Sequence, residues 1–280
     1  MFYQVEPLFP GLTRIWDVAR TAMYLVEGKD KAVLIDTGVG VGDLKGLVDS
    51  LTDKPVTVLL THGHVDHALG AIGFDDVRMS PLDGEIYQMH SVFEVRKDYV
   101  VSSAMYGGNP ALVVSISDSD YLQPRAAEDF APLAPGDRFD LGGVSVEVLR
   151  GQGHTPGALT MLIPEWRILL LGDACNHFTF LFDQWASPVP AYKEMLLQLK
   201  AETEGRYDRV ILSHGNGEAP VEMIDSVIEV CDEILAGKAD NLPFENPLGS
   251  GLIAKAMDFQ RFCRADGGAG NVVYDPKKLG

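Results

Sequence analysis

Short apolar runs separated by turns dominate the first sixty residues. Four of them have the length and residue types of strands, at residues 12–15, 23–27, 32–35 and 56–60. Between the last two runs, from residue 41 to residue 51, apolar residues recur at the spacing of a helix. The opening of the chain therefore predicts a hairpin, a helix and a strand, and the last apolar run reads as a buried strand.

The pattern changes in the middle of the chain and then returns to strands. Residues 81–129 look helical or irregular and carry scattered aromatic side chains. Strands are then predicted at residues 138–141, 144–149, 159–163, 168–171 and 209–212, and helices at residues 191–204, 220–235 and 252–262. Strand-rich halves with helices outside them predict an α/β protein with two packed sheets flanked by helices.

Composition narrows the expected partners. The chain has 280 residues, 46% of them hydrophobic, which suits one large domain or two small ones. The 40 acidic and 23 basic residues give a formal net charge of -17, which repels phosphate backbones and anionic lipid. We therefore expect a small-molecule substrate and neither nucleic acid nor membrane as a partner. The sequence is also compatible with a homodimer.

The N-terminal sequence, the lengths of the apolar runs and the cysteines together predict a cytoplasmic location. Residues 1–10 contain Glu6 and two prolines and lack a basic segment followed by an apolar stretch, so no signal peptide is expected. No apolar run reaches the roughly 20 residues that span a bilayer. The three cysteines are far apart and odd in number, which suits a reducing compartment.

The predicted strand at residues 56–60 leads directly into the sequence Thr61-His62-Gly63-His64-Val65-Asp66-His67. The imidazoles of His62 and His64 can converge on one ion if the backbone turns at Gly63. Asp66 and His67 then offer an oxygen and a nitrogen to a second ion, and zinc accepts both kinds of donor. Three of the seven histidines fall within six residues, a pattern that favours a metal site over a histidine-rich surface loop.

Three later segments repeat this arrangement of a metal-binding residue after a strand. The segment 153–157 is Gly-His-Thr-Pro-Gly and carries His154, residues 171–173 are Leu-Gly-Asp and end in Asp173, and residues 212–215 are Leu-Ser-His-Gly and carry His214. A rigid sheet can hold side chains at its strand ends in a fixed geometry. These three residues are therefore further candidate ligands.

Taken in order, these four motifs resemble the metallo-β-lactamase superfamily, within its glyoxalase II-like and lactonase-like branches, over roughly residues 20–215. The resemblance implies an αββα sandwich. We expect a single domain over residues 1–280, with a helical cap insertion at residues 83–129 and a C-terminal extension at residues 241–280, because these two segments are the longest without a metal-ligand motif. The resemblance also implies two metal ions at one edge of the sheets, zinc in the first place and iron or manganese as alternatives.

The resemblance assigns each ligand a role. His62, His64 and His154 bind the first ion; Asp66, His67 and His214 bind the second; and Asp173 bridges the two. Two dications that share a water lower its pKa toward neutrality and supply a hydroxide nucleophile. Asp66 has an additional catalytic role if it orients that hydroxide.

Other residues are candidates for contact with substrate. Tyr106, beside two glycines, is a candidate pocket residue, and His177 could face the substrate, orient a ligand or be a partly buried structural histidine. His90 is expected to be exposed and without a role. We expect substrate choice to depend on residues 83–129 and 241–280, including positions near Phe244 and Phe259.

Differences between this sequence and known branches of the superfamily limit the reactions that we expect. Asp173, as a bridging carboxylate, argues against β-lactam hydrolysis, and Asn176 stands where quorum-lactone hydrolases carry a tyrosine. The acidic composition disfavours the RNA-processing nucleases and with them phosphodiester hydrolysis. What remains is a hydroxyacylglutathione hydrolase-like or lactonase-like enzyme acting on a small ester, thioester or lactone. The alternatives are a mononuclear iron persulfide dioxygenase and a catalytically silent binding module.

Overall fold

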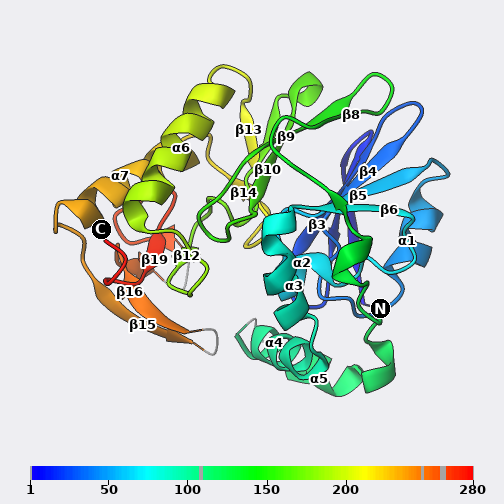
Figure 1. Cartoon of the computed structure of the whole chain (residues 1–280), viewed down its shortest axis with the longest axis horizontal. Coiled ribbons are helices and arrows are strands. Elements are labelled where there is room, and N and C mark those ends of the chain that lie inside the picture. Colours follow the sequence, from blue (N-terminus) through cyan, green and yellow to red (C-terminus); the bar gives the residue numbers. More distant parts are fainter. Residues whose placement is uncertain (1, 107–109, 247–248, 259–262, 280) are drawn as a thin grey trace. The chain divides into compact units, whose positions relative to one another are not determined.

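The computed structural model describes residues 2–106, 110–246, 249–258 and 263–279 (Figure 1). The chain divides into two compact units, Met1–Val146 and Glu147–Gly280. Each unit is built around its own β-sheet structure and its own buried apolar cluster.

The first unit contains a seven-stranded sheet whose strands follow chain order. They are β1 (Gln4–Phe9), β2 (Leu12–Trp16), β3 (Ala22–Glu27), β4 (Ala32–Ile35), β5 (Val56–Leu59), β6 (Asp76–Met79) and β7 (Ala131–Pro132). The first four pair antiparallel, and β4 to β7 pair parallel. Parallel neighbours need a crossover connection, and α1 (Leu44–Leu51) supplies the one between β4 and β5.

Burial explains why this sheet forms where the apolar runs predicted it. All four residues of β4 are buried, as are five of the six in β3. The side chain of Asp43 caps α1 by accepting a hydrogen bond from the N–H of Gly46, and Leu44 and Val48 face the core. Ile15, Leu34 and Val58 join these two residues in one buried cluster.

Helices occupy most of the predicted cap insertion. The segment contains α3 (Gly84–His90), α4 (Phe93–Tyr106) and α5 (Pro110–Ser115), together with two short 3-10 turns at Asp118–Asp120 and Ala127–Asp129. The helical character predicted for residues 83–129 is therefore confirmed for the residues that the structure describes. Its role as a cap over substrate stays a prediction.

The second unit is built mainly on a six-stranded sheet with the order β14-β13-β11-β10-β9-β8. Its strands are β8 (Arg138–Asp140), β9 (Ser145–Arg150), β10 (Leu159–Ile163), β11 (Ile168–Leu170), β13 (Arg209–Ile211) and β14 (Glu218–Ala219). Strand β8 belongs to the part of the chain that forms the first unit, and β9 continues across the division at Val146 into the second. Helix α6 (Val189–Thr203) connects the parallel strands β11 and β13.

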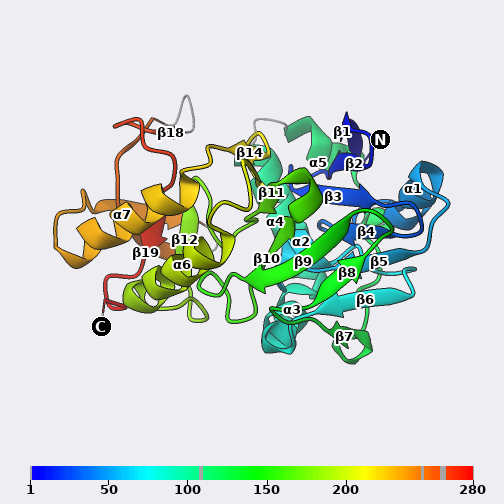
Figure 2. The same cartoon turned by 90° about the horizontal axis from the view of Figure 1, so that it is seen from above.

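A second, four-stranded sheet in this unit has the order β12-β19-β16-β15. Its strands are β12 (Thr179–Leu181), β19 (Val272–Tyr274), β16 (Gly249–Ile253) and β15 (Leu242–Asn246). Helices α6 and α7 (Met223–Leu235) pack against each other, as Figures 1 and 2 both show. Their buried side chains join Leu162, Leu169, Leu181 and Tyr274 in one core cluster.

The prediction of a helix at residues 252–262 is wrong for residues 252–258, the part of this segment that the structure describes. Strand β16 ends at Ile253 and β17 (Met257–Asp258) follows, paired with β18 (Cys263–Arg264). Leu252 packs against the helix-facing core, whereas Ile253 belongs to the cluster on the other face of the sheet. Ile253 pairs with Leu242 of β15 on one side and with Val273 of β19 on the other, and local periodicity does not record such cross-strand pairing.

The mixed sheets and flanking helices confirm the expected α/β fold class. Among the described residues, no helix is both long and apolar enough to cross a membrane.

Candidate metal centre

The histidine-rich motif of the first unit begins where β5 ends, and neighbouring acceptors hold its backbone. The N–H of Thr61 donates to Asp36 Oδ1 at 2.7 Å, and that of Gly63 donates to Asp83 Oδ2 at 2.9 Å. The short helix α2 (Val65–Ala68) then starts with two hydrogen bonds to the carbonyl of His64. A loop held at so many points is suited to placing its side chains accurately.

The ligand candidates of this motif converge. The ring centroid of His62 lies 4.1 Å from that of His67 and 4.7 Å from that of His64. His67 Nε2 is 3.5 Å from Asp66 Oδ2, and the His62 and His67 side chains are almost completely buried. Three imidazoles and one carboxylate in such proximity form the nitrogen and oxygen donor set that zinc binds.

The second unit gathers its own three candidates around one carboxylate. Asp173, after β11, lies 3.1 Å from His214 Nε2 and 3.7 Å from His154 Nε2. The two histidines follow different strands, His154 after β9 and His214 after β13. Asp173 therefore lies within reach of two imidazoles, which is the surrounding that a metal-bridging carboxylate needs.

Hydrogen bonds to Nδ1 orient three of these histidines. His154 Nδ1 donates to the carbonyl of Phe180 at 2.8 Å, His67 Nδ1 donates to Asp36 Oδ2 at 2.8 Å, and His62 Nδ1 lies 3.1 Å from Thr61 Oγ1. A proton held on Nδ1 makes Nε2 the nitrogen that can bind a metal. The residues of both units thus fit the donor chemistry of metal sites.

The sequence model of the metallo-beta-lactamase superfamily matches residues 16–214, which is well over half of the chain and takes in all seven candidate ligands. The chain belongs to this superfamily. The match confirms the family that the four motifs resembled and, with it, the expectation of a metal-binding hydrolase fold.

Two curated relatives illustrate how far the sequence similarity extends. An uncharacterised protein of Mycobacterium tuberculosis is 28% identical over 133 residues, which are 47% of this chain and 54% of the relative. The human acyl-coenzyme A thioesterase MBLAC2 is 26% identical over 166 residues, 55% of this chain and 58% of the relative. The matched part thus spans just over half the length of these relatives.

Solved structures show the same fold. A metallo-beta-lactamase from Pontibacter korlensis matches with a TM-score of 0.56 and 18% identity, over 82% of this chain and 99% of that protein. The inverting sec-alkylsulfatase Pisa1 from a Pseudomonas species matches with a TM-score of 0.60 and 17% identity, over 84% of this chain and 42% of the other. These TM-scores show the metallo-β-lactamase fold, and sequence identities this low leave the substrate undecided.

Asp36 is a residue of the site that the motif analysis missed. Its buried carboxylate accepts hydrogen bonds from His67 Nδ1, from the Thr61 N–H and from the Thr61 hydroxyl. A carboxylate behind a metal-binding histidine fixes the ring and raises its basicity. The sequence did carry one indication of this role, because Asp36 directly follows the apolar strand β4, much as Asp173 follows β11.

Tyr99 and Thr21 were missed as well. The hydroxyl of Tyr99, from α4, donates to Asp66 Oδ2 at 2.6 Å, and the hydroxyl of Thr21 donates to the same oxygen at 3.2 Å. Both residues are far from Asp66 in the chain, and neither lies in a metal motif. Two donors on one oxygen hold the carboxylate of Asp66 in a single orientation.

His90 is half-buried, so the prediction that it is exposed is wrong, whereas the prediction that it has no functional role stays a prediction. Its ring stacks on that of His64, with centroids 4.8 Å apart and planes at 15°, and its Nδ1 accepts the N–H of Val65 at 3.1 Å. Helix α3 carries His90 onto the motif from 25 residues away. Together with Asp83 and Tyr99, it makes the α3–α4 segment a support for the motif.

The structure describes the surroundings of only one of the two candidate pocket residues, His177. His177 is partly buried, with Nδ1 2.8 Å from the carbonyl of Ala269 and Nε2 3.3 Å from that of Glu218. These contacts tie together backbone segments of the second unit, and a role toward substrate stays a prediction. The side chain of Tyr106, like Phe259, lies outside the described residues.

The pKa of Asp17, a buried carboxyl group close to the motif, is raised. Asp17 accepts backbone N–H groups from Ala19, Thr21 and Val39, each at 2.9 Å. Burial, with a smaller contribution from the negative charge of Asp66, raises the pKa of Asp17 from 3.8 to about 6. Because the folded state holds this proton more tightly, the Asp17 contribution to stability declines as the pH rises from about 4 to about 6.

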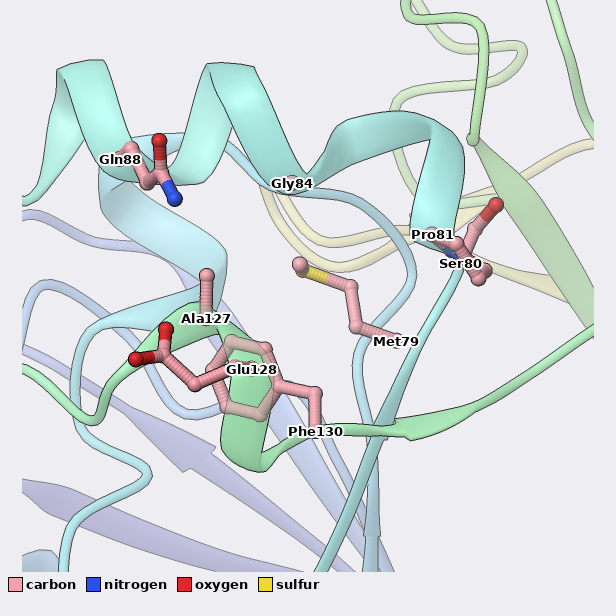
Figure 3. A pocket seen from close by; sticks show the side chains of 8 residues that line it. All are labelled: Met79, Ser80, Pro81, Gly84, Gln88, Ala127, Glu128 and Phe130. Atoms are coloured by element: carbon pink, nitrogen blue, oxygen red, sulfur yellow. The ribbon is translucent and has the colours of Figure 1, made fainter.

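A pocket of about 320 Å³ in the first unit lies apart from these ligands (Figure 3). It is lined by Met79, Ser80, Pro81, Gly84, Gln88, Ala127, Glu128 and Phe130. Gly84 and Gln88 occupy a different face of α3 from Asp83 and His90, which contact the motif. No candidate ligand lines this pocket, so it does not mark the site of the chemistry.

Proposed function

We propose that this chain is a hydrolase that uses two metal ions, zinc in the first place, to cleave small acyl thioesters, with esters and lactones as related substrates. The observation that carries the proposal is Asp173 between His154 and His214, because a bridging carboxylate is the ligand that joins two ions. The relatives named acyl-coenzyme A thioesterase MBLAC2 favour a thioester over a lactone.

The proposed ligand roles follow the resemblance. His62, His64 and His154 hold one ion; Asp66, His67 and His214 hold the other; Asp173 serves both. When bound, the ions supply Lewis acidity and a water of lowered pKa. Hydrolysis then forms a bond between the water oxygen and the acyl carbon, breaks the carbon–sulfur bond, and releases a carboxylic acid and a thiol.

The protein's own contribution to this chemistry is orientation. Asp36 fixes the ring of His67, the carbonyl of Phe180 fixes the ring of His154, and Tyr99 with Thr21 fixes the carboxylate of Asp66. Groups held in place by a second layer of hydrogen bonds need little reorganisation during the reaction. Asp66, oriented in this way, is the residue we assign to positioning the nucleophilic water.

Metal content and substrate preference test the proposal together. Elemental analysis of protein purified without chelator should find close to two transition-metal ions per chain, mainly zinc. In a panel of acyl thioesters, lactones, aryl esters and phosphodiesters, thioesters should be hydrolysed with the highest kcat/KM. A saturated, well-folded protein that holds a single iron and consumes oxygen with a persulfide would contradict the proposal in favour of the dioxygenase reaction.

Replacing Tyr99 with phenylalanine should weaken metal binding about tenfold, because Asp66 loses the 2.6 Å hydrogen bond that orients it. The affinity is measured by competition with a zinc-binding dye. Tyr87→Phe is the matched control, since it removes a 2.7 Å hydrogen bond to the carbonyl of Arg125 in the same segment. It should lower stability and leave zinc affinity unchanged. Equal zinc affinities in the two variants would mean that Tyr99 is only a packing residue.

A further inference from the structure

The four-stranded sheet of the second unit has an aromatic face. Phe178, Phe180 and Phe182 alternate along β12 and its flanking residues, and Phe244 of β15 packs against all three, with ring centroids 5.0–5.9 Å apart within the group. Ile253, Val273 and Met257 complete the cluster. We call the four phenylalanines the aromatic face.

The two sides of this sheet differ. Leu181 and Tyr274 point into the core that α6 and α7 cover, whereas the cluster on the aromatic face contains no described helical residue. Phe182 is 9% exposed, and Phe178, Phe180 and Phe244 are all partly exposed. Half-buried aromatic rings of this kind are typical of the lining of small-molecule sites.

Glycines shape this surface. A side chain on Gly249 would place its Cβ 2.8 Å from a ring carbon of Phe182, and one on Gly251 would lie 3.2 Å from the Cβ of Phe182. Strand β16 can therefore pass beneath the ring of Phe182 only without side chains at these positions. The arrangement leaves the aromatic rings as the surface that a ligand would meet.

Hydrogen bonds link the aromatic face to the candidate ligands of the same unit. The carbonyl of Phe180 accepts from His154 Nδ1 at 2.8 Å, and the N–H of Phe178 donates to Asn176 Oδ1 at 2.7 Å. Asn176 in turn donates to Asp173 Oδ1 at 3.4 Å. The backbone of β12 thus connects the rings with two metal-ligand candidates, and an apolar group on these rings would lie beside the chemistry.

We infer that the aromatic face binds the acyl group of the substrate and makes the enzyme selective for apolar acyl chains. This inference rests on the proposed function. The cluster on this face consists of Phe, Ile, Val and Met side chains, so it offers apolar contact to an acyl chain and no charged group to the carrier.

A chain-length series on a neutral carrier tests the inference. In N-acetylcysteamine thioesters from acetyl to octanoyl, kcat/KM should rise about two- to fourfold for each added methylene until the rings are covered. Phe244→Ala should reduce the octanoyl-to-acetyl ratio about tenfold, with metal content at the wild-type level, and Phe244→Leu should give an intermediate ratio. Phe139→Ala, which removes a partly buried ring from β8, is the matched control and should leave the ratio unchanged.

Direct binding separates failure of the inference from failure of the proposed function. Calorimetry with the thioethers S-octyl- and S-ethyl-N-acetylcysteamine should show at least about tenfold tighter binding of the octyl compound, lost in Phe244→Ala. If no thioester is cleaved but this preference is present, the function is wrong and the acyl site stands. Thioesters cleaved at rates independent of length, or a wild-type dimer that Phe244→Ala dissociates, would overturn the acyl site.

Discussion

Replacing Asp173 with alanine should reduce kcat/KM by at least about a thousandfold and lower the bound metal from about two ions to one or none. The reason is that its carboxylate lies within reach of both His154 and His214, so its loss affects both proposed ions at once. Hydrolysis of the preferred thioester and elemental analysis of the same preparation provide the two measurements.

Asp208→Ala is the matched control for this experiment. Asp208 also follows a secondary-structure element of the second unit, but its carboxylate is largely exposed and pairs only with Arg167 among the described contacts. An exposed ion pair of this kind contributes about 1 kcal/mol or less, so activity and metal content should stay at wild-type values. Full activity in Asp173→Ala would refute the proposed bridging role.

Replacing Asp36 with asparagine should weaken metal binding roughly 10- to 100-fold although Asp36 is not a proposed ligand. The asparagine amide cannot accept from His67 Nδ1 and from both groups of Thr61 as the carboxylate does, so the ring of His67 loses its orientation. A buried group left without its partner should also lower the free energy of unfolding by about 1–3 kcal/mol. Zinc competition and chemical denaturation measure the two effects.

Asp76→Asn controls for the general cost of removing a carboxylate from the same sheet. Asp76, on β6, bonds to Thr57 and Arg78 and touches no candidate ligand in the described contacts. It should keep wild-type zinc affinity. If Asp36→Asn lowered stability but bound zinc as tightly as Asp76→Asn does, Asp36 would be a folding residue rather than a residue that orients His67.

The ligand candidates could be predicted from the sequence because their signals are local. Four histidine or aspartate residues within six positions, each type suited to zinc, need no knowledge of the fold. The strands that carry them were also readable, since alternation and apolar runs are local patterns. The supporting residues were not predictable in this way.

The missed contacts join positions that are distant in the chain. Asp36 is 31 residues from His67, Tyr99 is 33 residues from Asp66, and His90 is 25 residues from Val65. An aspartate at a strand end or a tyrosine in a helix looks the same whether it supports a metal ligand or faces solvent. The predicted helix at residues 252–262 overlapped the end of β16 because the sequence does not show that this strand pairs with β15 on one side and with β19, some 20 residues further on, on the other.

Strand β15, at the edge of the four-stranded sheet, has a consequence for solubility. An edge strand can pair with a strand of another molecule, and exposed apolar side chains such as Leu242, 40% exposed, increase that risk. Pro243 cannot donate a backbone hydrogen bond, and the exposed Glu245 places a charge on the same strand. The protein can therefore display Phe244 at a sheet edge while these two neighbours oppose intermolecular strand addition and aggregation.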